Sequence, residues 1–264
     1  MWSAIGACIK GDAHVRNNMP CQDALLIQHI EGLGLLCILS DGHGSKKCKY
    51  SDEGAKVASE VVASLYKNMN SQRGKKNIYN IIDQTRDIEL PKKIERLWKE
   101  EIRRIHQKAQ REEVETDKDL FMLYGTTLLT LLITEAFIFA MQLGDGDILA
   151  TSKEGETDYF IKPDHVLGVA TYSLCMEDSW KYFNNRLVRI QKGMEIPELF
   201  LMSTDGYINS FINTKDFLKI GKDYLNILKQ EGADFIREHL PKWLTETSRE
   251  GSGDDITFAM VYRL

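Results

Sequence analysis

Aspartate beside glycine recurs at the ends of short apolar runs, and this pattern limits the fold more than any other feature of the chain. Three apolar runs lead into such a pair, and a fourth run follows one. A strand end is rigid and glycine allows close approach, so each carboxylate is expected at a fixed place on the rim of a sheet. The four pairs are Asp41-Gly42, Gly144-Asp145, Asp205-Gly206 and Gly253-Asp254.

Each pair taken alone predicts only a turn, because Asp-Gly is also a common hairpin connection. Several carboxylates that converge at one sheet end repel one another unless divalent cations neutralise them, and ligands that are all oxygen favour Mg²⁺ or Mn²⁺. A calcium loop that begins at Asp145 is a weaker alternative. Leu149 and Ala150 stand at its fifth and sixth positions, where a calcium loop has an oxygen ligand and glycine.

The apolar runs predict strands, and three amphipathic stretches predict helices over Asp52–Asn70, Lys92–Glu113 and Tyr224–Thr245, the last with a break near Gly232. Strands cluster early, in the middle and late, with the helices between the clusters. This order favours an α+β fold with largely antiparallel sheets over a doubly wound parallel sheet. The strand candidates are Ala24–His29, Leu33–Leu39, Thr126–Thr134, Ala136–Gln142, Asp147–Thr151, Leu187–Ile190, Leu199–Met202 and Ile256–Tyr262.

Composition narrows the class of protein. The net charge of −5 argues against nucleic acid or an anionic membrane as a partner. The cysteine count of 5 is odd, with no metal-binding spacing, which indicates reduced thiols. We expect neither a secretory leader nor a membrane-spanning segment, because the sequence shows no basic start followed by an apolar stretch and no apolar run long enough to cross a bilayer. We therefore expect a cytoplasmic protein that forms one domain over residues 1–264, with a helical insertion at about residues 74–119 where strand signals are weakest.

Six motifs, taken in order, resemble those of the metal-dependent protein serine/threonine phosphatases of type 2C, and they span nearly the whole chain. The resemblance is closest to a bacterial branch in which a segment beginning at His14 replaces the usual arginine-containing start. The motifs are Gln22-Asp23-Ala24, Asp41-Gly42-His43-Gly44, Tyr124-Gly125-Thr126-Thr127, Gly144-Asp145, Thr204-Asp205-Gly206 and Asp254-Asp255-Ile256-Thr257.

The resemblance implies a four-layer α/β/β/α sandwich of two mostly antiparallel sheets, with a centre of two or three Mg²⁺ or Mn²⁺ ions at one end. It implies attack on phosphorus by a water between two ions, and His43 as the acid that protonates the leaving alkoxide. It also assigns the metal residues. Asp41 bridges two ions, the Gly42 carbonyl, Asp205 and Asp254 ligate them, Asp23 orients a metal-bound water, and Asp145 contributes to a third ion.

Two departures from the family pattern stand out. Gln22 replaces an acidic residue, and the phosphate-binding arginine has no match, because Asn18 occupies its spacing. Arg16 is the first candidate for that role and His14 is the second. Asp147 stands where the family's G-D-S-R motif ends in arginine.

The leading hypothesis is a Mg²⁺- or Mn²⁺-dependent protein serine/threonine phosphatase that acts on a phosphorylated protein and opposes a protein kinase. The alternative is a catalytically weak, phosphatase-like module that binds phosphoproteins. Retained metal ligands argue for activity, since a binding module needs none. Gln22 and the missing arginine argue for the alternative.

Overall fold

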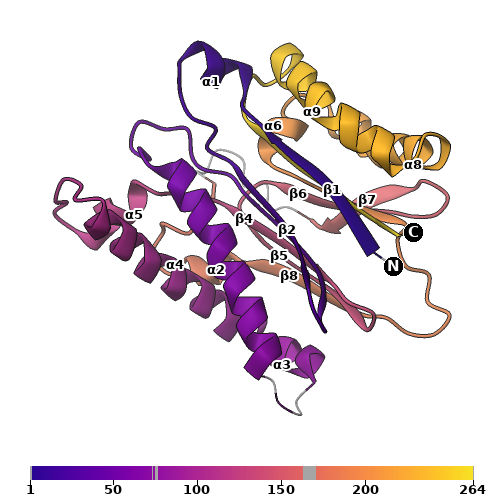
Figure 1. Ribbon diagram of the computed structural model, residues 1–264, viewed down its shortest axis with the longest axis horizontal. Helices are drawn as coiled ribbons and strands as arrows, with labels where there is room; N and C mark the ends of the chain where they lie inside the picture. Colours follow the sequence, from indigo (N-terminus) through magenta and orange to yellow (C-terminus); the bar gives the residue numbers. More distant parts are fainter. Residues whose placement is uncertain (1, 73, 75–76, 163–170, 264) are drawn as a thin grey trace.

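The chain folds into two five-stranded antiparallel sheets that face each other, with helices on both outer faces (Figure 1). The computed structural model describes residues 2–72, 74, 77–162 and 171–263. One sheet has the order β1-β10-β9-β6-β7 and the other β2-β3-β4-β5-β8. The strands are β1 (Trp2–Ile9), β2 (Ala24–Ile30), β3 (Gly34–Ser40), β4 (Leu128–Ile133), β5 (Phe137–Leu143), β6 (Asp147–Thr151), β7 (Thr157–Ile161), β8 (Asn184–Arg189), β9 (Leu199–Ser203) and β10 (Ile256–Arg263).

Helices cover the two outer faces in separate groups. In Figure 1, α2 and α4 lie on the sheet that contains β2, whereas α8 and α9 lie on the sheet that contains β1. The helices are α1 (Asp12–Arg16), α2 (Ser51–Gln72), α3 (Ile78–Thr85), α4 (Glu89–Lys108), α5 (Asp117–Met122), α6 (Asp205–Ile208), α7 (Thr214–Leu218), α8 (Ile220–Gln230) and α9 (Ala233–Glu250), with a 3₁₀ turn, η1, at Ser179–Tyr182.

Strand β3 shows how the sequence specifies these layers. Leu35, Cys37 and Leu39 belong to the core between the two sheets, whereas Leu36 and Ile38 pack toward the helices. Because side chains alternate between the faces of a strand, a strand buried on both faces is a continuous apolar run. The α+β sandwich predicted from the sequence is confirmed.

The outer helices are held by apolar contacts and by a few buried polar ones. Trp98 of α4 is fully buried, and its Nε1 donates a hydrogen bond to the carbonyl of Gly54 in α2 at 3.0 Å. The expected break near Gly232 separates α8 from α9, and Gly232 has a φ of +85°. The segment 74–119 contains α3 and α4, and α4 packs beside α2 in the outer layer. That this segment is an insertion in a single domain stays a prediction.

Strands β1 and β7 have no counterpart among the predicted strands. Each is only partly buried and lies at an edge of its sheet, so its apolar signal is weak. Among the helices described, none combines the length and hydrophobicity needed to cross a membrane.

Candidate metal centre

Four loops meet at one end of the sandwich and enclose a cavity of about 410 Å³. Asp41 directly follows β3, and Asp145 lies in the turn between β5 and β6. Asp205 is the first residue of α6, and Asp254 lies just before β10. His43 lines the same cavity. Antiparallel pairing brings these strand ends to one rim, so carboxylates far apart in sequence converge as expected.

Asp41 is fixed by the strand beside it. The hydroxyl of Thr126 and the backbone N–H of Thr127 donate hydrogen bonds to the Asp41 carbonyl at 2.9 and 2.8 Å. The hydroxyl of Thr127 accepts the Asp41 N–H at 3.1 Å. The paired threonines of the Gly-Thr-Thr motif therefore hold the backbone of a residue 85 positions away in sequence.

Gly42 is required by close packing. Its N–H donates to the carbonyl of Gln22 at 3.1 Å. A Cβ at this position would lie 2.5 Å from that same oxygen and 2.7 Å from the carbonyl oxygen of Ser51. Any side chain would therefore push Gly42 away from the segments that contain Gln22 and Ser51.

The side chains of Asp41 and Asp205 lie close enough to interact with each other. Burial, together with the charges of Asp23 and Asp205, raises the pKa of Asp41 well above its usual value. Burial and the charge of Asp145 raise the pKa of Asp205 to about 6. These carboxyl groups resist ionisation in the protein alone, because bringing several negative charges out of water to one place is costly.

The donor set fits Mg²⁺ or Mn²⁺. The four aspartates that converge here offer oxygen, the ligand that hard divalent ions select. Within the described residues, no three Asp, Glu, His or Cys side chains are already gathered as a complete ligand set. Mg²⁺ does not need such a cage, since it usually keeps several waters and takes one or two carboxylates. The crowding that raises the pKa of Asp41 and Asp205 is relieved by a bound cation.

Asp23 lies behind the cavity rather than in its lining. It is buried, and its Oδ2 accepts a hydrogen bond from the hydroxyl of Thr204 at 2.9 Å. The same hydroxyl accepts the N–H of Thr257 at 2.9 Å, so the threonine that follows β9 links the residue before β2 to β10. Burial raises the pKa of Asp23 well above its usual value. The role of Asp23 in orienting a metal-bound water stays a prediction.

The structure does not bring Arg16 to the cavity. Its side chain is 71% exposed and pairs with Asp12 on the same short helix at 3.0 Å. His14 lies closer to the rim. Its Nδ1 is 2.9 Å from Oδ2 of Asp255, without hydrogen-bond geometry, and its Nε2 is 3.9 Å from Oδ1 of Asp254.

His43 occupies the wall of the cavity. Its N–H donates to the carbonyl of Gly125 at 3.1 Å, which orients the residue that follows the Asp-Gly pair. Burial lowers the pKa of its imidazole, and the charge of Asp145 opposes this effect. His43 lies in the same cavity as the aspartates, and its role as a proton donor stays a prediction.

The last sequence motif predicts a supporting, hydrogen-bonding role for Asp255, whereas the features at Thr171 and Asp147 escaped the sequence reasoning. Asp255 anchors the centre, since its Oδ1 and Oδ2 accept the N–H groups of Gly11 and Gln22 at 2.7 and 2.6 Å. Thr171 donates a hydrogen bond to Asp145 and lines the cavity. Asp147 is fully buried with neither oxygen hydrogen-bonded, and burial raises its pKa to about 8. The departure at Asp147 from the G-D-S-R pattern was the one available signal.

An ion pair in α4 holds one wall of the cavity. Lys99 and Glu95 lie 2.5 Å apart and are mostly buried. Lys99 also donates to the carbonyl of Met176, a cavity residue, at 2.9 Å. Glu95 accepts the N–H of Trp180 at 2.9 Å. The sequence predicted a helix here but gave no sign that it would position the site.

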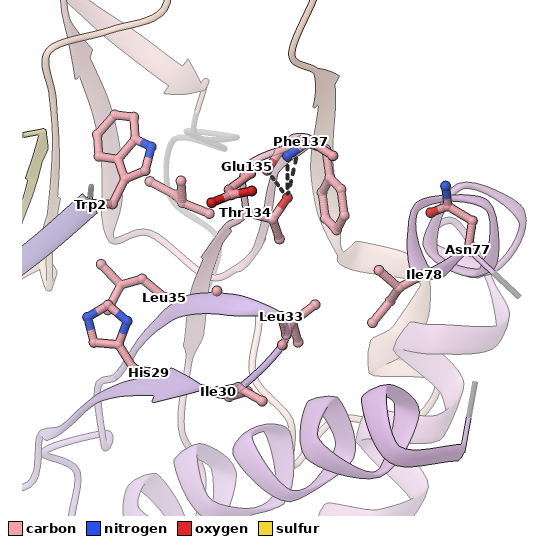
Figure 2. A pocket seen from close by; sticks show the side chains of 14 residues that line it. Trp2, His29, Ile30, Leu33, Leu35, Asn77, Ile78, Thr134, Glu135 and Phe137 are labelled. Carbon is pink, nitrogen blue, oxygen red and sulfur yellow. Dashed lines mark hydrogen bonds between the residues drawn. The ribbon is translucent and has the colours of Figure 1, made fainter. Parts of the chain in front are cut away.

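A second cavity of about 570 Å³ lies at the opposite end of β3, where Gly34 and Leu35 line it (Figure 2). Apolar side chains dominate its lining, and Glu135 contributes the carboxylate seen in Figure 2. The Thr134 hydroxyl accepts the N–H of Phe137 at 2.9 Å and closes the adjoining turn (Figure 2). Among the described residues that line this cavity, Glu135 carries the one carboxylate, in contrast to the four aspartates of the first cavity.

Comparisons with known proteins identify the family of the chain. The family model described as protein phosphatase 2C matches residues 10–245. A search of curated proteins by sequence finds no match.

Solved structures share the fold at low sequence identity. The serine/threonine phosphatase Stp1 from Staphylococcus aureus is 15% identical, with a TM-score of 0.65, over 100% of this chain and 96% of that one. The S. agalactiae serine/threonine phosphatase is 18% identical, with a TM-score of 0.62, over 100% of both chains. The catalytic domain of the phosphatase PstP, in complex with two manganese ions, is 13% identical, with a TM-score of 0.59, over 99% and 97%.

Proposed function

The chain belongs to the protein phosphatase 2C family and is a serine/threonine phosphoprotein phosphatase, and from this premise we propose that the cavity containing Asp41, Asp145, Asp205 and Asp254 is its active site. One observation carries the proposal. Four carboxylates from four separate loops converge beside His43, and their crowding raises the pKa of Asp41 and Asp205. Such a site is built to receive positive charge.

We propose that Asp41, Asp205 and Asp254, with the carbonyl of Gly42, hold two Mn²⁺ or Mg²⁺ ions, and that Asp145 serves a third. The two manganese ions in the PstP structure support this number. When bound, such ions supply Lewis acidity, which neutralises phosphate charge and lowers the pKa of water to near neutrality.

The protein's own residues hold the aspartates in position and protonate the leaving oxygen. Thr126 and Thr127 fix the backbone of Asp41, and Thr204 fixes Asp23 from behind. His43, which follows Gly42, lines the cavity. From there its imidazole can deliver a proton to the seryl or threonyl oxygen that leaves phosphorus. These roles require rigid placement, which the buried strand ends provide.

Phosphate recognition differs from the family pattern. The described lining of the cavity contains no arginine or lysine, and Arg16 points to solvent beside Asp12. We propose that the hydroxyl of Ser45, which lines the cavity, contacts a phosphate oxygen. The assignment of Arg16 to the phosphate stays a prediction that this placement does not favour.

The physiological setting is proposed from composition and chemistry. The substrate is a phosphorylated protein, and the counterpart that we propose is a protein kinase. The net charge of −5 disfavours nucleic acid and anionic membranes as partners. The cysteines of the described chain are free thiols, which fits a reducing cytoplasm.

Hydrolysis of a phosphothreonine peptide tests the proposal, with Mn²⁺, with Mg²⁺ and with a chelator. We expect release of inorganic phosphate with either metal and none with chelator. Tight peptide binding without turnover in either metal would instead identify a phosphoprotein-binding module.

A further inference from the structure

We propose that Cys8 and Cys21 are a covalent modification site, at which a hydroperoxide joins the two thiols in a reversible disulfide. The Sγ atoms lie 3.5 Å apart, although the residues are 13 positions apart in sequence. Cys8 is at the end of β1 and is exposed, and Cys21 lies in the segment before β2 and is partly exposed. Contact between two thiols that an oxidant can reach is the arrangement that disulfide formation needs.

The other three cysteines are less suited to such a reaction. Cys37, Cys48 and Cys175 are buried. Cys48 and Cys175 line the active-site cavity, where a cation and substrate compete with an oxidant for access. The position of the Cys8–Cys21 pair outside that lining makes it separable from the catalytic chemistry by experiment.

The chemistry balances with one hydroperoxide. The sulfur of Cys8 attacks the O–O bond to give a sulfenic acid, with water or an alcohol as the reduced product when the thiol proton is included. The sulfur of Cys21 then displaces hydroxide from the sulfenic acid, forming the S–S bond and, with its own proton, releasing water. Two thiols are oxidised by two electrons and one peroxide is reduced. A dithiol restores both thiols.

The disulfide has a mechanical consequence for the metal centre. A disulfide holds its sulfurs at about 2.0 Å, so the 3.5 Å contact must close. Cys21 directly precedes Gln22, whose N–H is bound by Asp255, and the Cys8 thiol contacts the carbonyl of Asp23 at 3.8 Å. Closing the contact therefore pulls on the segment that positions Asp23. We infer that the disulfide weakens cation binding, an inference that rests on the proposed function.

Peroxide treatment of the whole 264-residue chain tests the site directly. The experiment compares hydrogen peroxide with dithiothreitol, counts thiols after denaturation, and maps tryptic peptides by mass spectrometry. Lys10 and Arg16 lie between the two cysteines, so trypsin separates them unless a disulfide joins the peptides. We expect loss of two of the five thiols, a linked pair of peptides containing Cys8 and Cys21, and full reversal by dithiothreitol.

Matched variants separate this site from the cavity thiols. Cys8→Ser and Cys21→Ser should each abolish the linked peptides, and the double variant Cys48→Ser, Cys175→Ser should retain them. The Cys21→Ser variant is needed because the tryptic peptide that contains Cys21 also contains Cys37. Five remaining thiols, or a Cys8 oxidised to sulfinic acid without a bridge, would overturn the proposal.

Calorimetry with Mn²⁺ tests the consequence separately from turnover. We expect the verified disulfide form to bind Mn²⁺ at least threefold more weakly than the reduced form, with affinity regained in dithiothreitol. Equal affinities in the two forms would overturn the link to the metal centre. Absence of Mn²⁺ binding in the reduced protein would contradict the proposed function instead, while the peptide map still decides whether the disulfide exists.

Discussion

Oδ2 of Asp255 accepts a hydrogen bond from the backbone N–H of Gln22 at 2.6 Å, which ties the start of β10 to the segment before β2. Its neighbour Asp254 lines the cavity instead, and the Asp254 side chain is 53% exposed. The two adjacent aspartates thus have different positions and different roles. One points into the protein and anchors the scaffold, and the other faces the cavity.

Isosteric substitution should separate the two residues. Asp255→Asn replaces one of the two acceptor oxygens with an NH2 group. One of the N–H groups of Gly11 and Gln22 therefore loses its partner. We expect the free energy of unfolding in chelator, measured with urea, to fall by about 1–3 kcal/mol. Asp254→Asn should leave that value nearly unchanged but weaken Mn²⁺ binding. A reversed pattern would show that the roles of the two residues are exchanged.

His43→Ala should affect poor leaving groups more than good ones. General acid catalysis supplies about 10²–10⁴-fold in rate, and a nitrophenolate hardly needs a proton. Turnover of a phosphothreonine peptide should therefore fall by about that factor, and turnover of nitrophenyl phosphate should fall little. Both substrates are measured on one preparation in saturating Mn²⁺. Equal losses on both would mean that His43 merely supports Asp41.

The Glu95–Lys99 pair should control peptide binding. Lys99→Met removes the hydrogen bond to the Met176 carbonyl and loosens that wall of the cavity. We expect the KM for a phosphothreonine peptide to rise several-fold, with kcat and Mn²⁺ affinity nearly unchanged. The matched control is Arg96→Met, which breaks an exposed pair with Glu100 on the same helix. Surface pairs of that kind contribute about 0–1 kcal/mol. An equal change in both variants would refute a positioning role for Lys99.

The hydroxyl of Thr204 should be needed for stability and for Mn²⁺ binding. Thr204→Val keeps the shape but removes the hydrogen bonds to Asp23 and to the N–H of Thr257. We expect the free energy of unfolding to fall by about 1–3 kcal/mol and Mn²⁺ binding to weaken. Thr204→Ser keeps the hydroxyl and should retain most Mn²⁺ affinity. If valine and serine behaved alike in Mn²⁺ calorimetry, the hydroxyl would have no such role.

The sequence was most informative for residues whose position in the fold depends on a single neighbouring strand. Asp41, Asp145, Asp205 and Asp254 each adjoin an apolar run, so their positions on a sheet rim followed from local pattern. Predicting that these four side chains meet in one cavity required the order of the motifs, because periodicity alone does not determine which strand ends are neighbours. The cavity lining confirms that these side chains lie together, and their roles as ligands stay predictions.

Contacts between distant segments left no local signal. The Asp255 bonds join residues 233 and 244 positions apart, and Glu95 contacts Trp180 across 85 positions. A mixed-charge helix such as α4 has the same sequence pattern whether its ion pairs face solvent or a neighbouring loop. Arg16 was chosen for its nearness in sequence to Asp23, but α1 turns its side chain toward Asp12 and solvent.

The most direct test of the metal-centre proposal is Mn²⁺ titration by calorimetry of the wild type and of Asp41→Asn, Asp205→Asn and Asp254→Asn, with peptide turnover measured on the same preparations. Each substitution replaces a charged oxygen donor with a neutral one at a rigid strand end. The account predicts loss of most Mn²⁺ affinity and of most turnover in all three, with each variant still folded in chelator. Near-wild-type Mn²⁺ affinity and turnover in any two of them would contradict it.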